Sequence, residues 1–305
     1  VVMASRLRRI SSHVISSAAT QTSFPHVTAP LHYQRLIPGK RVGRYIGVPD
    51  AGELADEHDV VKVPVMDARE ACREASLETT GFELRSWPTA CQNFEDHEEI
   101  KRLYYKEIEA LVKKATGCER VLVFDHTLRT SDAKHLNELG TGAAAGSVLR
   151  VHTDYTMESA PKRLQQLAEQ GSYTGTRLST QEQEALSANR FAFINVWRSI
   201  ADEPVYVRPL ALCDARSVDY RHEAIPYEMH YTDRIGANYA LAHKERHRWF
   251  HYPKMQKDEC ILFKVYEKDE NRTRTVFHTA FDDPTTPRDA PPRRSIECRT
   301  IACFS

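Results

Sequence analysis

The sequence lacks the features that would place it in several common classes of protein. Its 305 residues contain no run of roughly 18 apolar residues, which a membrane-spanning helix requires. The 42 basic and 42 acidic residues balance and the pI is about 7.3, so no overall positive charge indicates a nucleic-acid or anionic membrane partner. We therefore expect a soluble protein with no nucleic-acid partner and no membrane partner.

Absent motifs narrow the class further. Neither a GxGxxG loop nor a GxxxxGK[ST] loop occurs, so a nucleotide-binding loop is not supported. The GxSxG turn of a serine nucleophile is also missing. The 7 cysteines are dispersed and form no CxxC pair, which excludes the usual zinc-finger and iron–sulfur spacings and is typical of reduced thiols. These absences favour a cytoplasmic enzyme.

Acidic residues are also missing from the start of the chain, where the first is Asp50. The first 20 residues are rich in serine and carry Arg6, Arg8 and Arg9, a composition that mitochondrial leaders share. A disordered leader without a targeting function has the same composition, and we expect residues 1–25 to be one. The alternative is that this segment is a mitochondrial leader, in which case the protein would be mitochondrial and not cytoplasmic.

The remaining chain predicts helices first and short strands later. An N-cap at Asp96, an apolar stripe at helical spacing and a stop at Gly117 predict a helix over 96–116. Residues 160–170 and 180–188 are also expected to be helical. Strands are expected at 60–66, 118–124, 191–197, 205–207, 239–241, 248–252, 261–266, 274–278 and 295–304. Residues 21–60 are polar and rich in proline, which predicts an arm over the domain surface.

This order of elements predicts a mainly β fold with flanking α-helices. Many short strands after an initial helical part are typical of a β-sandwich or jelly-roll core. We expect residues 26–305 to form one domain. Its helical and arm part would extend to about residue 120, and the jelly-roll core would follow from about 120 to 305.

The most informative motif pairs His152 with Asp154. Residues i and i+2 of an extended segment project to the same side, so both side chains can bind one ion. With a distal histidine, His278, they would place two imidazoles and one carboxylate on one face of a metal. That arrangement leaves positions open and is typical of non-heme Fe(II) oxygenases.

Other histidine patterns compete with this site. An H-x-E motif at His97 falls on the first turn of the expected helix, where i and i+2 point apart. A second at His243 leaves only about 34 residues before the distal histidine, too few for half of a jelly roll. His243, His247 and His251 would form a zinc-binding stripe on a helix, but the aromatic residues among them favour a strand.

Several segments match a known family. They are VFDHT at 123–127, VHTDYT at 151–156, NVWR at 195–198, PLALCDARS at 209–217, HRWF at 247–250, HTAFD at 278–282 and PRRSIE at 292–297. From about residue 31 onwards the chain resembles the fungal and bacterial hydroxylase/desaturase family, which includes gibberellin-type desaturases, aspergillic-acid-cluster hydroxylases and proteins related to the cephalosporin methoxylase subunit. The resemblance implies the double-stranded β-helix (jelly roll) of Fe(II)/2-oxoglutarate oxygenases.

The resemblance also implies a set of site residues. Fe(II) would be held by the triad of His152, Asp154 and His278, and 2-oxoglutarate and O₂ would be the co-substrates. Arg293 and Arg299 follow the distal histidine by 15 and 21 residues, a pairing similar to that of the DNA dealkylase branch of the superfamily. Residues six apart on a strand face the same side, so both could hold carboxylates, and Asn195 could hydrogen-bond 2-oxoglutarate.

The expected function is the hydroxylation or desaturation of a small secondary metabolite by hydrogen abstraction. Tyr155, Tyr239 and Trp249 are candidate walls of the substrate pocket. Two alternatives stay open: a redox-inactive binding subunit of a biosynthetic complex, and a zinc-dependent hydrolase or lyase that uses the same ligands. The sequence leaves the substrate and the oligomeric state unknown.

Overall fold

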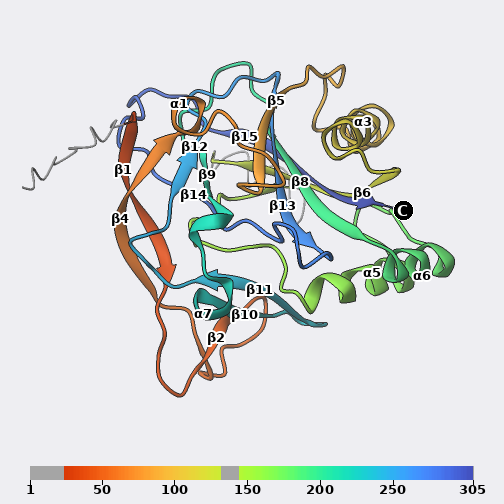
Figure 1. Ribbon diagram of the computed structural model, residues 1–305, viewed down its shortest axis with the longest axis horizontal. Coiled ribbons are helices and arrows are strands. Elements are labelled where there is room, and N and C mark those ends of the chain that lie inside the picture. The colour runs from red at the N-terminus through yellow and green to blue at the C-terminus, as the bar shows by residue number, and fades with distance from the viewer. Residues whose placement is uncertain (1–23, 132–143, 305) are drawn as a thin grey trace, which may run out of the picture.

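The computed structural model describes residues 24–131 and 144–304, so the expected leader lies almost entirely outside the described residues. This part of the chain is mainly β, with a few helices on its periphery (Figure 1). Three sheets account for the strands, and two of them are joined through His152.

The five-stranded sheet has the order β1 (His26–Gln34), β4 (His58–Asp67), β12 (Trp249–His251), β9 (Leu210–Cys213) and β14 (His278–Ala280). The four-stranded sheet has the order β11 (Ile235–Leu241), β10 (Ala224–His230), β2 (Arg41–Tyr45) and β3 (Leu54–Ala55). The six-stranded sheet has the order β5 (Phe82–Ser86), β13 (Glu259–Glu267), β8 (Phe191–Ser199), β15 (Arg294–Cys303), β6 (Arg120–Thr130) and β7 (Ala144–Ala145).

The helical segments are short. They are α1 (Ala68–Ala71), α2 (His97–Glu99), the π-helical η1 (Ile100–Tyr104), α3 (Tyr105–Thr116), α5 (Ser159–Glu169), α6 (Thr180–Ala188), the 3₁₀ turn η2 (Ala215–Ser217) and α7 (Tyr220–Glu223). The expected helix over 96–116 is confirmed as the continuous run α2, η1 and α3, with Asp96 as the N-cap and Gly117 in the left-handed conformation at φ 68°. The expected helix over 180–188 is confirmed as α6, which begins with a capping box between Ser179 and Glu182.

Three sequence-based predictions about strands are wrong. Residues 26–34 form β1, an edge strand paired with β4, where an arm was expected. Its inner residues Ala29, Leu31 and Tyr33 are fully buried. Residues 205–207 form no strand, and the strand expected at 274–278 begins only at His278, as β14.

The six-stranded sheet separates two apolar layers. Its outer face packs against α3, through residues such as Ile108 and Val112 of the helix and Ile296 of β15 (Figure 1). Its inner face carries Phe193, Trp197 and Phe263, which pack with residues of the five-stranded sheet in the central core. Because strand residues alternate between faces, Asn195, Glu297 and Arg299 share the inner side with Trp197.

The segment before α5 joins the two smaller sheets. His152 forms one antiparallel bridge with His278 of β14 and another with Ala240 of β11. The histidine therefore lies between the five-stranded and four-stranded sheets, opposite the inner face of the six-stranded sheet. This junction places the first expected ligand beside the distal one.

Candidate metal centre

The triad residues converge in three dimensions although 126 positions of sequence separate the two histidines. Asp154 Oδ1 lies 3.8 Å from His152 Nε2 and 3.7 Å from His278 Nε2, and the donor atoms of the three side chains lie within 4.8 Å of one another. Both histidines are buried, at 8% and 3% exposure. Two imidazole nitrogens and a carboxylate oxygen therefore face one small volume.

Backbone carbonyls fix the orientation of both imidazole rings. His152 Nδ1 lies 2.7 Å from the carbonyl oxygen of Arg150, and His278 Nδ1 lies 3.1 Å from that of Val276. A carbonyl only accepts, so each Nδ1 carries the hydrogen and each Nε2 presents its lone pair to the centre. Such outer hydrogen bonds are typical of metal-binding histidines, and the donor set fits a metal ion.

The surroundings keep Asp154 ionised. Burial raises the pKa of this carboxyl, but His278, Arg299 and His152, together with a hydrogen bond from Asn195, outweigh burial and lower the pKa to about 2. The amide nitrogen of Asn195 donates to Asp154 Oδ2, which leaves Oδ1 to face the imidazoles. Burial also lowers the pKa of His152, so its imidazole is neutral, the form that binds a metal.

Asn195 lies beside the carboxylate of Asp154. Its donor nitrogen is occupied by the carboxylate of Asp154, and its Oδ1 has no hydrogen-bond partner within the described part of the chain. The residue lies on β8, directly opposite Arg299 of β15 in the sheet register. Its amide nitrogen therefore faces the Oδ2 atom of Asp154.

Arg299 is surrounded by carboxylates of the protein itself. Its Nη1 donates to Asp125 Oδ1 at 3.0 Å and to Thr127 Oγ1 at 3.0 Å, and its Nη2 donates to Glu297 Oε1 at 3.1 Å. Burial lowers the pKa of this guanidinium, but Asp125 and Glu297 raise it well above its ordinary value, so Arg299 is always charged. Its charge is largely compensated by residues of β6 and β15.

Arg293 differs, because its buried charge forms no salt bridge with a described carboxylate and only Glu297 raises its pKa through electrostatic attraction. The side chain is 4% exposed and lies over the ring of Trp197, with 5.8 Å between the guanidinium carbon and the ring centroid. Its Nη1 donates to the carbonyl oxygen of Arg208 at 2.6 Å, and its Nε has no partner within the described residues. Burial lowers the pKa of Arg293 to about 9. A buried guanidinium that forms no salt bridge is suited to an anionic ligand.

The backbone that receives Arg293 is unusual. Arg208 has a φ of 48°, a left-handed conformation that non-glycine residues rarely adopt. This conformation turns the Arg208 carbonyl toward Arg293, while the Arg208 side chain bonds Asp282 at 3.1 Å. Backbone strain of this kind is often found at functional sites, and here it positions the carbonyl oxygen that accepts a hydrogen bond from the buried guanidinium.

A cleft of about 640 Å³ leads to the triad. His152, Asp154 and Tyr155 line it, and Tyr155 packs edge-on against Phe193 at 5.0 Å between ring centroids. Tyr239 lines a neighbouring cavity of about 440 Å³, where its hydroxyl accepts from the backbone nitrogen of Met157. Tyr155 therefore lines the cleft that holds His152 and Asp154, whereas Tyr239 lines the other cavity.

Trp249 is not part of the cleft. It is fully buried in the core between β4 and β9, and its indole nitrogen donates to the hydroxyl of Tyr33 at 2.6 Å. The expected role as a pocket wall is therefore wrong, because Trp249 faces away from the central core. The sequence alone did not indicate which face of β12 this residue would occupy.

The competing histidine stripe does not form a site. His251 lies on β12 and packs against Phe281, whereas His247 bonds Glu223 at 3.1 Å. The rings of His243 and His247 are 6.5 Å apart between centroids. His97, the other alternative, contacts His126 rather than a carboxylate, at 2.9 Å between ring nitrogens.

Two residues near the metal centre, Asp125 and Arg150, were not predicted from the sequence. Asp125 lies within a segment that carried the family resemblance, yet its contacts with Arg299 and Arg163 could not be read from the spacing. Arg150 stands two residues before His152, so its side chain faces the same side of an extended segment and lines the cleft. That spacing was a usable signal for Arg150.

Comparisons with known proteins agree with the class that this centre defines. A family described as YDMC, oxidoreductase/YMDC permease-like domain, matches residues 43–303. The α-ketoglutarate-dependent dioxygenase phiK of a fungal species is 30% identical over 274 residues, which cover 84% of this chain and 91% of that protein. The hydroxylase/desaturase efuI of Hormonema carpetanum is 29% identical over 304 residues, which cover 93% of this chain and 97% of that protein.

A solved structure shares the fold. The iron and α-ketoglutarate-dependent endoperoxidase NvfI superposes with a TM-score of 0.77 at 22% identity, covering 92% of this chain and 98% of that one. The chain therefore belongs to the family of Fe(II)- and 2-oxoglutarate-dependent dioxygenases that includes hydroxylases and desaturases. Its cofactor is Fe(II), and its co-substrates are 2-oxoglutarate (α-ketoglutarate) and O₂. No helix within residues 24–131 and 144–304 is both long and apolar enough to cross a membrane.

Proposed function

We propose that His152, Asp154 and His278 bind Fe(II) and that the protein hydroxylates or desaturates a small secondary metabolite. The observation that carries this proposal is the convergence of two Nε2 lone pairs and one carboxylate on one point. Three protein ligands leave several positions open on an octahedral ion. When bound there with 2-oxoglutarate and O₂, iron supplies the oxidising chemistry that removes hydrogen from a C–H bond and converts 2-oxoglutarate into succinate and CO₂.

Arg293 is proposed to hold the distal carboxylate of 2-oxoglutarate. Its guanidinium is buried, lacks a carboxylate partner within the described residues and retains an unbonded Nε. A carboxylate would supply charge-assisted hydrogen bonds that Arg208 alone does not provide. Trp197, which lies under the guanidinium, would pack against the carbon chain of the co-substrate.

Arg299 and Asn195 are proposed to act through Asp154. The amide of Asn195 occupies Oδ2 of the carboxylate, and Arg299 lowers its pKa by electrostatic attraction. Both keep Asp154 ionised and correctly rotated. Arg299 could also approach a carboxylate of the co-substrate near the metal, as first expected, but Asp125 and Glu297 already compensate its charge.

The architecture supports these roles. We propose that the five-stranded and six-stranded sheets are the two facing halves of a double-stranded β-helix, and that residues 26–305 form one oxygenase domain. His278 on β14 and Arg293, which directly precedes β15, would then come from opposite sheets and enclose the metal and co-substrate. The inner apolar layer would exclude water from the reaction.

The substrate is proposed to enter through the 640 Å³ cleft beside Asp154 and Tyr155. The relative phiK is named as a fungal dioxygenase and the relative efuI as a hydroxylase/desaturase. These names support an organic metabolite as substrate. Hydroxylation and desaturation share the first hydrogen abstraction. The position of the substrate relative to the iron decides between them.

The test is succinate formation from 2-oxoglutarate by the purified protein with Fe(II) under air, with a matched pair of variants. Asp154→Ala removes a proposed ligand, whereas Asp50→Ala changes an exposed loop carboxylate far from the triad in sequence. We expect succinate from the wild type and from Asp50→Ala but none from Asp154→Ala. Equal succinate from both variants would refute the assignment of the triad.

A zinc-dependent hydrolase would share the ligands but would not need Arg293. Zn²⁺ in place of Fe(II) therefore distinguishes the two functions, because zinc has no redox chemistry. We expect no 2-oxoglutarate turnover with Zn²⁺ and full turnover with Fe(II). A binding subunit without turnover would form no succinate with either metal.

A further inference from the structure

The cleft that leads to the triad collects positive charge. Among its lining residues, seven are basic and three are acidic, a surplus of four (7 − 3 = 4). The basic residues are Arg44, Arg129, Arg150, Lys162, Arg163, Arg234 and Arg299, and the acidic ones are Asp125, Asp154 and Glu158. The whole chain, by contrast, has 42 basic and 42 acidic residues, so this surplus is local.

The acidic residues of the cleft do not compensate this charge. Asp154 faces the two imidazoles of the triad, where a metal ion would add further positive charge. Asp125 is held between Arg299, at 3.0 Å, and Arg163, at 3.4 Å. Glu158 is the one acidic lining residue that lies outside these contacts. Arg234 pairs with Asp233 at 3.0 Å, outside the cleft lining. The cations that form no salt bridge with another described residue are Arg44, Arg129, Arg150 and Lys162.

Among the basic residues of the cleft, Arg150 has the most closely packed side chain. Its side chain lines the cleft although the residue is only 8% exposed, and no carboxylate within the described residues forms a salt bridge with it. The guanidinium carbon lies 3.8 Å from the ring centroid of Tyr227, and Nη2 lies 3.4 Å from Asn238 Oδ1. Nη1 has no hydrogen-bond partner among the described residues. A rigidly held, unpaired donor of this kind is suited to an anion.

This anion would be different from 2-oxoglutarate. Arg150 packs against Tyr227 of β10 and Asn238 of β11, in the four-stranded sheet. Arg293 packs against Trp197 of β8, in the six-stranded sheet, and does not line the cleft. The two guanidinium groups therefore contact different sheets, and neither forms a salt bridge with a described residue.

We propose that the substrate of this cleft is an anion, a mainly apolar metabolite whose carboxylate pairs with Arg150. Arg44 and Lys162, both exposed at the cleft, attract it from solution. The apolar body lies against Tyr155 and Met229, which places a C–H bond rather than the carboxylate beside the triad. This inference rests on the proposed function, because it takes the triad cleft as the substrate site.

The test uses a pair of fluorescent dyes that differ in charge. The anionic probe is 8-anilinonaphthalene-1-sulfonate and the neutral one is N-phenyl-1-naphthylamine, and both are titrated anaerobically into full-length protein with Fe(II) and saturating 2-oxoglutarate. We expect Arg150→Gln to weaken binding of the anion about tenfold or more, because a charge-assisted hydrogen bond is lost, and to leave the neutral dye unchanged. Arg150→Lys, which keeps the charge, should recover part of the affinity.

Two further variants guard against misfolding and unspecific binding. Arg44→Gln alters an exposed side chain of the same cleft and should weaken the anion severalfold, whereas Arg73→Gln, an exposed arginine outside the cleft, should change nothing. The proposal is overturned if the wild type binds both dyes equally, or if Arg150→Gln binds the anion as the wild type does. It is also overturned if Arg150→Gln weakens 2-oxoglutarate by the same factor, since Arg150 would then belong to the co-substrate.

The failure of this inference can be told from the failure of the proposed function. The visible absorption band of the iron–2-oxoglutarate chelate is recorded in the same samples. A band without any preference for the anion refutes the anionic substrate alone. The absence of a band in the folded wild type refutes the function on which the inference rests.

Discussion

At the scale of single residues, Asn195 decides how Asp154 is presented. Its amide donates to Oδ2, so Oδ1 stays free to face the two imidazoles. Removing a side chain that orients a metal ligand typically lowers metal affinity about 10- to 100-fold. We expect this loss in Asn195→Ala, measured by Fe(II) titration, with the exposed Asn189→Ala as control. Unchanged Fe(II) affinity in Asn195→Ala would show that Asp154 binds the metal without the hydrogen bond from Asn195.

Two neighbouring arginines offer a matched comparison for the co-substrate. Arg293 is buried without a carboxylate, whereas Arg294 is partly exposed and pairs with Glu95 at 3.0 Å. We expect Arg293→Gln to raise the KM for 2-oxoglutarate at least tenfold, equivalent to about 1.4 kcal/mol or more, and Arg294→Gln to leave it unchanged. Steady-state succinate assays measure both. Similar KM values in the two variants would show that Arg293 does not bind the co-substrate.

The same residues show what the sequence could predict. The common face of Arg293 and Arg299 follows from strand parity, because they are six residues apart. Their different surroundings do not follow, since Asp125, which compensates Arg299, comes from β6 and lies 174 positions away in the chain. The triad was found because its members have chemically distinctive side chains. The sequence could place Asn195 near the triad, but it could not show which group Asn195 would hydrogen-bond.

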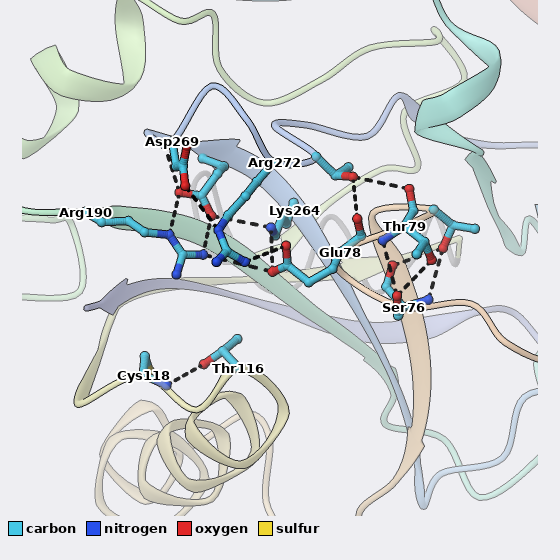
Figure 2. Close-up of polar contacts among 12 residues, drawn as sticks. Ser76, Glu78, Thr79, Thr116, Cys118, Arg190, Lys264, Asp269 and Arg272 are labelled. Atoms are coloured by element: carbon cyan, nitrogen blue, oxygen red, sulfur yellow. Dashed lines mark hydrogen bonds and ion pairs between the residues drawn. The ribbon is translucent and has the colours of Figure 1, made fainter. Parts of the chain in front are cut away.

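At the scale of elements, β13 ends in a buried network of ion pairs. Figure 2 shows Lys264 and Arg272 converging on Glu78, with Nζ of Lys264 at 3.0 Å. Lys264 also lies 3.4 Å from Glu267, a fully buried residue that Arg190 binds at 2.8 Å. Each charge therefore has at least one partner of opposite sign, which a buried ion pair requires.

Removing one charge from this network should destabilise the protein strongly. We expect Glu267→Gln to lower the free energy of unfolding by about 3–5 kcal/mol, because Lys264 would remain buried with less compensation. Glu270→Gln is the control, since that carboxylate is 83% exposed and should contribute less than about 1 kcal/mol. Urea denaturation measures both. A loss below about 1 kcal/mol in Glu267→Gln would contradict the role of the network.

Strand β1 shows why one element was misjudged. Val27, Ala29, Leu31 and Tyr33 alternate with more polar residues, a strand pattern that was present in the sequence. Pro30 argued against a strand, yet it pairs with Lys62 in the register of an edge strand, where proline is tolerated. Whether a strand lies at an edge is a property of the whole sheet and cannot be read from the segment itself.

At the scale of the whole molecule, buried histidines link stability to pH. Burial, together with the nearby His97 and Lys101, lowers the pKa of His126 to about 4. The unfolded chain binds a proton at His126 below pH 6.5, whereas the folded protein does not until about pH 4. Stability therefore falls as the pH falls from 6.5 to 4, by up to roughly 3 kcal/mol from this residue.

The expected result is a flatter pH dependence in His126→Gln than in the wild type. Urea denaturation of metal-free protein at several values between pH 4 and 7.5 measures it. His222→Gln, which alters a histidine whose side chain is 72% exposed, should keep the wild-type slope. Parallel curves for the wild type and His126→Gln would contradict a neutral buried His126.

The general architecture was more predictable than its details. A mainly β fold with flanking helices followed from the order of periodic segments, and helix α6 was found with its full bounds. The junction at which His152 bridges β14 and β11 required tertiary pairing between segments more than 80 residues apart. The positive cleft, likewise, is built from several elements and leaves no trace in a chain whose net charge is zero.

The most direct test of the central claim is anaerobic titration of metal-free protein with Fe(II) and then 2-oxoglutarate, followed by visible absorption. The account predicts a weak chelate band in the wild type, its disappearance in His152→Ala, and a weaker band in Arg293→Ala at the same concentration of 2-oxoglutarate. The exposed His222→Ala should keep the full band. No band in folded wild-type protein, or an undiminished band in His152→Ala, would contradict the assignment of the metal centre.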